Sequence, residues 1–195
     1  MTKRVILITG TPRTGKTSTS HLLASKLDAL YINLTDLAKQ EKLTLGKDKK
    51  RNTTIIDQKA MKQKLTTTIK NSQKNNIIID GHYASNVISK KLASHVFILR
   101  RNPIELRKIM EQTGFTKDKL WENLASEILD VCLFDAINAY GQEKACEIDA
   151  TGKSTEKTVS EILEVLDGKR KCHIGIVDWL GMLERENILN DYLKI

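Results

Sequence analysis

Residues 10–17, GTPRTGKT, combine two glycines, a lysine and a threonine in the spacing of a phosphate-binding loop, G-x-x-x-x-G-K-[ST]. Glycines at both ends allow the backbone to curl, so that successive N–H groups point at one anion. Lys16 then reaches the β- and γ-phosphates, and the hydroxyl of Thr17 ligates Mg²⁺. An apolar run precedes the loop and a helical pattern follows it, which is the context that such a match requires. These residues predict the binding of a nucleoside triphosphate with magnesium.

A second chemical signal is the acid within IIIDGHY at 77–83. Proteins with a phosphate-binding loop use an aspartate at a strand end to hold the magnesium shell, directly or through water, and Asp80 is predicted to do this. His82 follows two residues later. Its neutral imidazole could position or deprotonate a water near the γ-phosphate, as glutamine does in small GTPases. A solvated loop histidine is the alternative, and these residues alone leave both open.

Short apolar runs alternate with longer helical patterns along the chain, and these elements must position the chemical groups. Continuous apolar runs are typical of strands buried on both faces of a parallel sheet. The predicted strands are 4–9, 30–33, 76–80, 95–99 and 145–149, and the predicted helices are 15–27, 34–42, 57–73, 103–112, 117–140 and 155–168. Their alternation predicts a doubly wound α/β fold. A last segment, 176–193, has helical spacing and could dock on the domain or meet a partner.

Length and composition indicate one soluble domain. The 195 residues suffice for one well-buried core, and no stretch approaches the ~20 apolar residues of a membrane span. Met-Thr-Lys-Arg leads directly into the first predicted strand, so we expect no secretory signal peptide. Three cysteines at unrelated spacings (Cys132, Cys146 and Cys172) favour reduced thiols in the cytoplasm over a disulfide framework or a zinc site.

A formal net charge of +8 favours polyanionic partners such as nucleotides, RNA or an acidic protein. A lysine-rich surface that only keeps the protein soluble explains the same charge, and composition does not separate the two. Aromatic residues make up 5% of the chain, which argues against a surface that stacks single-stranded bases.

Several motifs together resemble the adenylate kinase isoenzyme 6 family, whose members are also described as coilin-interacting nuclear ATPases and small-ribosomal-subunit assembly factors. The archaeal form is the most similar, and the resemblance extends from the phosphate loop to about Trp179. The motifs are GTPRTGKT at 10–17, LAKQEKL at 37–43, IID at 55–57, DGH at 80–82, LRR at 99–101, GFTKDKLWENLASEILDV at 114–131, IDATGKS at 148–154 and VDW at 177–179.

This resemblance implies an α/β fold of the P-loop nucleoside monophosphate kinases: a single domain, 1–195, whose sheet of about five parallel strands is flanked by helices. A monophosphate-binding insert is expected at about 33–56 and a lid at about 112–123. The implied reaction is ATP + AMP = 2 ADP, with Mg²⁺ as cofactor, a possible breadth of monophosphate specificity, and ATP hydrolysis alongside. The implied partners are ribosomal protein uS11 and the pre-ribosomal small subunit, during whose maturation the protein would act. We expect a cytoplasmic monomer or weak oligomer that has no membrane contact.

The family's functional positions fall on particular residues of this chain. The implied catalytic residues are Lys16, Asp80 and His82, and magnesium is assigned to Thr17 and Asp80. The implied ATP-binding residues are Gly10, Arg13, Thr14, Gly15, Lys16, Thr17, Ser18 and Lys153. Lys39 and Arg51 are assigned to the monophosphate. For most of the charged run at 47–51, a solvated loop is the simpler interpretation.

The chain departs from the family pattern where kinases of this type place arginines that clamp the transferring phosphoryl group. The matching positions before and at the start of the lid are Ile109 and Thr113, and the arginine that usually takes AMP is Lys39. One well-placed arginine is worth ~10³–10⁵ in rate, so these departures favour an alternative function: an ATPase switch that binds uS11 and has little kinase activity. A kinase for another small acceptor, such as a nucleoside or shikimate, is disfavoured by the motif at 114–131.

Arg13 also departs from the family, because a small residue usually occupies this point of the loop. Its guanidinium could fold over the phosphates or pair with an acidic neighbour. It could also point outward from a loop that tolerates it. We favour contact with the nucleotide.

Overall fold

Five parallel strands form the central sheet of the computed structural model, which describes residues 3–48 and 53–194. The strand order is β2-β5-β1-β6-β7. Their bounds are β1 Arg4–Thr9, β2 Leu30–Asn33, β5 Asn76–Asp80, β6 His95–Arg100 and β7 Ala145–Asp149. All four strand pairs are parallel. The five predicted strands are therefore confirmed, and the strand predicted at 95–99 is one residue longer.

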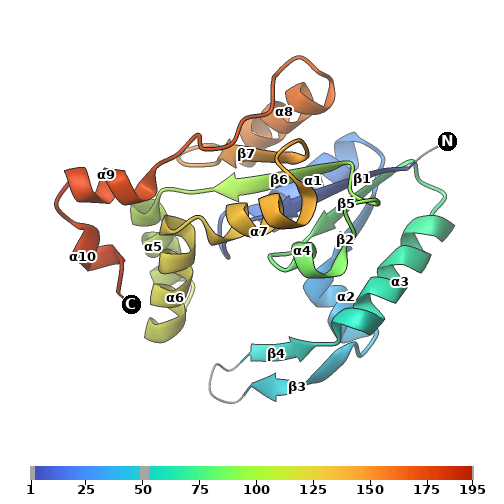
Figure 1. Ribbon diagram of the computed structural model, residues 1–195, viewed down its shortest axis with the longest axis horizontal. Coiled ribbons are helices and arrows are strands. Elements are labelled where there is room, and N and C mark those ends of the chain that lie inside the picture. Colours follow the sequence, from blue (N-terminus) through green and yellow to red (C-terminus); the bar gives the residue numbers. More distant parts are fainter. Residues whose placement is uncertain (1–2, 49–52, 195) are drawn as a thin grey trace.

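Alternate residues of the strands point to opposite faces of the sheet, and both faces are buried. In β1, Val5 and Leu7 belong to one apolar cluster, whereas Ile6 and Ile8 belong to another. Helices α3 (Gln58–Asn71), α4 (Ala84–Val87) and α7 (Val131–Tyr140) cover the first face, and α1 (Lys16–Lys26) and α8 (Thr155–Leu166) cover the second (Figure 1). Because each residue of a central strand meets a helix on one side or the other, the strands read as continuous apolar runs.

The helices occupy most of the predicted ranges. Their bounds are α1 Lys16–Lys26, α2 Leu34–Gln40, α3 Gln58–Asn71, α4 Ala84–Val87, α5 Pro103–Gln112, α6 Lys117–Ile128, α7 Val131–Tyr140, α8 Thr155–Leu166, α9 Trp179–Arg185 and α10 Leu189–Tyr192. The start of α5 is set as expected: Asn102 accepts a hydrogen bond from the Ile104 N–H, and Pro103 occupies the first helical position. No helix in the described ranges is long and apolar enough to cross a membrane.

The single helix predicted at 117–140 is wrong, because the chain breaks between α6 and α7. Asp130 has a left-handed backbone with φ of 56°, and its carboxylate pairs with the guanidinium of Arg100. The apolar periodicity of the sequence continues through this point, but the ion pair with Arg100 holds the chain in a turn there. The segment at 176–193 likewise forms two short helices, α9 and α10, separated by Asn187 with φ of 58°.

An antiparallel hairpin inside the 33–56 segment was not predicted. Its strands are β3 Thr44–Asp48 and β4 Thr53–Ile56, and it projects below the main sheet in Figure 1. The segment Thr44–Asp48 is polar and carries few apolar residues, so it gives no strand signal. Leu45 is 70% exposed and Ile55 is 47% exposed, which shows that the hairpin contributes little to the core.

The C-terminal segment packs within the chain. Leu183 of α9 lies in an apolar cluster with Leu106 and Met110 of α5 and Leu124 of α6. Figure 1 shows α9 and α10 beside α5 and α6, at the side of the molecule away from α3. Helices α9 and α10 therefore support α5 and α6, the helices on either side of the turn within the lid expected at about 112–123.

The expectation of reduced cysteines is wrong for two of the three. Cys146 of β7 and Cys172 form a disulfide, with Cα atoms 5.1 Å apart, whereas Cys132 is free. The chain after α8 returns along β7, where the Glu147 N–H donates to the carbonyl of His173 over 2.9 Å. This return of the chain brings together two cysteines that lie 26 residues apart, a pairing that their sequence spacing does not indicate.

Candidate active site

The phosphate loop connects the end of β1 to the first residue of α1. Gly10 has φ of 136°, and a Cβ there would lie 2.4 Å from the backbone oxygen of Leu99, so only glycine allows this approach to β6. Gly15 has φ of 99° and precedes the first turn of α1. The free N–H groups and positive end of the α1 dipole consequently face the inside of the loop, as anion binding requires.

Lys16 is folded into this loop. Its side chain is buried, and Nζ donates to the carbonyl oxygen of Thr11 over 2.8 Å. Burial lowers the pKa of Lys16, and the nearby carboxylate of Asp80 opposes that shift. The ammonium therefore occupies the centre of the loop, where an arriving phosphate would replace the Thr11 carbonyl as its partner.

Asp80 lies at the carboxyl end of β5, beside the end of β1, and is 1% exposed. Its Oδ2 accepts hydrogen bonds from three side chains: Thr17 Oγ1 at 2.8 Å, Tyr31 OH at 3.1 Å and Asn33 Nδ2 at 3.0 Å. Burial raises the pKa of Tyr31 to about 12, so its phenol remains a donor. Sequence reasoning missed Tyr31 and Asn33, although both belong to a strand that ends at the same sheet edge as Asp80.

The contact between Thr17 and Asp80 suits magnesium. A hydroxyl and a carboxylate are hard oxygen donors, and Mg²⁺ is usually held by one or two such groups together with substrate phosphates and water. Within residues 3–48 and 53–194, no group of three or more His, Cys, Asp or Glu side chains could hold a metal ion by itself. Residues Thr17 and Asp80 therefore fit a magnesium ion that arrives with a nucleotide.

His82 follows Asp80 in the turn after β5. Burial lowers the pKa of its imidazole, the Lys16 ammonium lowers it further, and the Asp80 carboxylate opposes both. The ring is consequently neutral near pH 7 and can accept a proton. His82 therefore lies close enough to Lys16 and Asp80 for their charges to change the pKa of its imidazole.

The described residues line two cavities beside the loop. The smaller, of about 270 Å³, is lined by Arg13, Gly15, Lys16, Thr17, Ser18 and Ile109. The two positions where kinases of this type place arginines carry no charge here: Ile109, which lines this cavity, is apolar, and Thr113 Oγ1 donates to the backbone oxygen of Ile109 over 2.8 Å. Most of the predicted ATP-binding residues line the smaller cavity, and Gly10 and Thr14 belong to the same loop.

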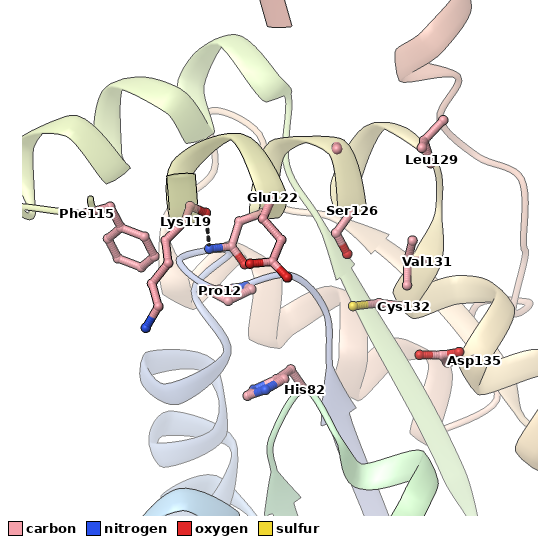
Figure 2. A pocket seen from close by; sticks show the side chains of 12 residues that line it. Pro12, His82, Phe115, Lys119, Glu122, Ser126, Leu129, Val131, Cys132 and Asp135 are labelled. Atoms are coloured by element: carbon pink, nitrogen blue, oxygen red, sulfur yellow. Dashed lines mark hydrogen bonds between the residues drawn. The ribbon is translucent and has the colours of Figure 1, made fainter. Parts of the chain in front are cut away.

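The larger cavity, of about 660 Å³, lies between the phosphate loop and helices α6 and α7. Figure 2 shows Lys119, Glu122 and Ser126 on α6 above Pro12 of the loop, with His82 on the opposite side. Its remaining lining residues are Phe115, Asn123, Ala125, Leu129, Val131, Cys132 and Asp135. His82 lines this cavity and Lys16 lines the smaller one, so each cavity has one of the predicted catalytic residues in its wall.

Three predicted residues lie away from this centre or outside the described residues. Lys153 follows β7 and pairs with Glu161 of α8, with 2.8 Å between Nζ and Oε1. Lys39 lies in the last turn of α2 and is exposed. Arg51, with its neighbours Lys49 and Lys50, falls outside the residues that the structure describes.

A buried cluster behind the loop was missed by sequence reasoning. Glu127, at the end of α6, is 1% exposed and accepts hydrogen bonds from Thr11 Oγ1 at 2.6 Å and Arg100 Nε at 2.9 Å. It also accepts one from Trp179 Nε1 of α9 at 3.1 Å. Burial alone would lower the pKa of Arg100, but the carboxylates of Glu127, Asp130 and Glu147 together raise it. This cluster connects the phosphate loop to helix α6 and to the C-terminal segment.

Comparisons with known proteins show the family to which this chain belongs. Residues 6–130 match the family model described as "AAA domain". A protein of Pyrococcus furiosus is 34% identical over 181 residues, which cover 92% of this chain and 93% of that protein. A protein of Methanocaldococcus jannaschii is 35% identical over 174 residues, covering 89% and 92%. Both carry the name "Putative adenylate kinase". The chain belongs to this archaeal adenylate kinase family.

Family membership confirms the resemblance found in the sequence. The fold is supported independently by the structure of thymidylate kinase from Candida albicans, which has a TM-score of 0.56 and 17% identity and covers 86% of this chain and 92% of that one. The predicted P-loop nucleoside monophosphate kinase fold is therefore confirmed.

Proposed function

We propose that this protein is a magnesium-dependent adenylate kinase that transfers the γ-phosphoryl group of ATP to AMP, and that it also hydrolyses ATP. The observation that carries the proposal is the meeting of Lys16, Thr17 and Asp80 at one end of the sheet, beside a second cavity large enough for an acceptor. The names of the archaeal relatives support the choice of reaction.

The phosphates of ATP bind in the loop, where the N–H groups and the start of α1 face them. Lys16 releases the carbonyl of Thr11 and contacts the β- and γ-phosphates. Thr17 and Asp80 hold magnesium, which neutralises charge on the β- and γ-oxygens when bound. Tyr31 and Asn33 keep the Asp80 carboxylate in place through their hydrogen bonds. Of the remaining predicted contacts, we assign Lys153 to the ATP side of the site.

The acceptor occupies the larger cavity, with its phosphate directed toward Lys16. An oxygen of the AMP phosphate attacks the γ-phosphorus, the bond from that phosphorus to the β–γ bridging oxygen breaks, and two ADP molecules result. Lys39 lies away from this cavity and Arg51 lies outside the described residues, so their assignment to the AMP phosphate rests on the sequence alone. In the absence of AMP, the neutral His82 orients one water for the same displacement and accepts its proton.

An assay with ATP alone, and then with each nucleoside monophosphate added, tests this function. We expect AMP to be consumed and ADP to form in a ratio of two ADP to one AMP, with Lys16→Ala as the inactive control. If the added monophosphates are not phosphorylated and only inorganic phosphate accumulates, the kinase assignment is wrong.

The second candidate is an ATPase switch in small-subunit maturation that binds uS11. Neutral residues at Ile109 and Thr113 favour it, because they weaken transfer more than hydrolysis. The charge of +8 suits a ribosomal surface. Binding of purified uS11 that changes between the ATP and ADP states supports this function, and binding that is absent or independent of nucleotide contradicts it.

A further inference from the structure

We propose that Arg13 is a catalytic residue of this site: its guanidinium binds the transferring phosphoryl group from the phosphate loop, because Ile109 on the facing side of the smaller cavity supplies no charge. This inference rests on the proposed function, because it concerns the same site and the same γ-phosphate.

The position of Arg13 is the first observation. Arg13 lines the smaller cavity together with Lys16 and Thr17. Its backbone has φ of 72°, a left-handed conformation that glycine adopts freely and that other residues rarely adopt. A long cationic side chain therefore stands at a point of the loop where the local backbone favours glycine. Its side chain is exposed, so it can turn toward a bound phosphate without leaving a core.

The partners of the other arginines are the second observation. Within residues 3–48 and 53–194, every arginine except Arg13 makes a side-chain hydrogen bond or ion pair with a neighbouring side chain. These pairs are Arg4 with Asn76, Arg100 with Glu127, Arg101 with Glu105, Arg107 with Glu111, Arg170 with Glu161 and Arg185 with Asp178. Arg13 has no carboxylate partner among the described residues, so no ion pair competes with a phosphate for its guanidinium.

The contact that Arg13 does make is the third observation. Its guanidinium carbon lies 5.5 Å from the centre of the Phe115 ring, in the loop that joins α5 to α6. A cation–π contact at an exposed site is weak, whereas an arginine can bind phosphate through two charge-assisted hydrogen bonds. The contact with Phe115 therefore keeps the Arg13 side chain next to the cavity, and it breaks when the guanidinium binds the phosphates of a triphosphate.

Across the smaller cavity from the phosphate loop lies Ile109 of α5. Phosphoryl transfer depends on positioning and on stabilisation of the charge that spreads over the γ-phosphate oxygens. Ile109 provides none, and Lys16 provides a compact point charge without the planar fork of a guanidinium. Arg13 is consequently the described arginine that both lines the cavity and is free to contact the phosphoryl group.

The test compares four variants with the wild type: Arg13→Gln, Arg13→Gly, Arg13→Lys and Arg185→Gln. Glycine accommodates φ of 72°, so Arg13→Gly keeps the loop conformation and its thermal unfolding serves as a folding control. Arg185→Gln removes an exposed arginine of α9 and is the matched control. The measurements are kcat for ADP formation from ATP and AMP, and the Kd of magnesium-ATP by calorimetry.

We expect both Arg13→Gln and Arg13→Gly to lower kcat by about 10³-fold, the effect of losing one phosphoryl-binding arginine, while the Kd for ATP changes less than about fivefold. Arg13→Lys should retain an intermediate rate, and Arg185→Gln should match the wild type. Adding Ile109→Arg to Arg13→Gly should recover part of the rate from the lid side. A kcat for Arg13→Gln within about threefold of the wild type overturns the proposal.

Failure of the proposed function gives a different result. If the wild type phosphorylates no monophosphate, the adenylate kinase assignment fails, and the same variants are compared for ATP hydrolysis. Loss of hydrolysis in Arg13→Gln at a preserved Kd then still supports contact with the γ-phosphate, and unchanged hydrolysis rejects it.

Discussion

Replacing Glu127 with leucine tests whether the buried cluster behind the phosphate loop holds the loop and the C-terminal segment together. The Glu127 carboxylate accepts hydrogen bonds from the side chains of Thr11, Arg100 and Trp179 and from the backbone N–H of Arg101. Leucine is similar in size but accepts none of them. The change therefore leaves four donors without this acceptor, one of them on a buried guanidinium.

The expected cost follows from these contacts. Breaking a buried ion pair by removing one partner costs about 3–5 kcal/mol, and Arg100 keeps Glu147 and Asp130, which holds the loss near the lower end of that range. In a domain of this size, 1 kcal/mol shifts Tm by roughly 2–4 °C, so we expect Tm to fall by roughly 6–12 °C. Glu127→Gln should lower the free energy of unfolding by less, because the glutamine oxygen can still accept the hydrogen bond from Arg100 and its NH₂ group can donate to the Thr11 hydroxyl.

Thermal unfolding followed by circular dichroism measures this loss, and the Kd of magnesium-ATP reports its effect on the loop. ATP binding should weaken, since the carbonyl of Thr11 is the partner of Lys16. Glu122→Leu, on the exposed face of the same helix, is the control for stability and should change the free energy of unfolding by less than about 0.5 kcal/mol. A Tm for Glu127→Leu within about 2 °C of the wild type would refute the reasoning.

Four further predictions concern His82, Tyr31 and the disulfide. Burial and the Lys16 ammonium lower the pKa of His82 below its ordinary value of 6.5, so the imidazole is mostly neutral at pH 6.5. Hydrolysis should therefore decline only below pH 6.5, and a rate that already falls with acid above pH 6.5 contradicts this. His82→Ala should also reduce hydrolysis more than phosphoryl transfer, and equal losses would argue against its role with water. Tyr31→Phe removes one of three donors to Asp80 and should raise the magnesium concentration for half-maximal activity by roughly tenfold; an unchanged magnesium titration is the contrary result. Cys172→Ser opens a closed loop of 26 residues and should lower the free energy of unfolding by about 3 kcal/mol, whereas equal Tm values for variant and wild type under non-reducing conditions would speak against the disulfide.

The candidate site was predictable to the extent that its chemistry is local in sequence. The phosphate loop is a continuous stretch whose glycines, lysine and threonine act within eight residues, and Asp80 was found because it ends an apolar run. Tyr31 and Glu127 could not be found in this way, because their partners lie 49 and 116 residues away along the chain. A glutamate among the apolar residues of α6 weakly indicates a buried carboxylate, but the sequence does not indicate which side chains donate hydrogen bonds to it.

The sequence by itself determined the five strands, the phosphate loop and the helix that follows it, because periodicity and loop chemistry depend on neighbouring residues. Tertiary structure alone decided where the helix pattern of 117–140 breaks, how Cys146 meets Cys172, and which donors surround Asp80. In each case the deciding contact joins strands, helices or loops that pack side by side only after folding. A pattern along the chain indicates whether each segment prefers a helix, a strand or a loop. Charge pairing and burial depend instead on which segments the fold brings together.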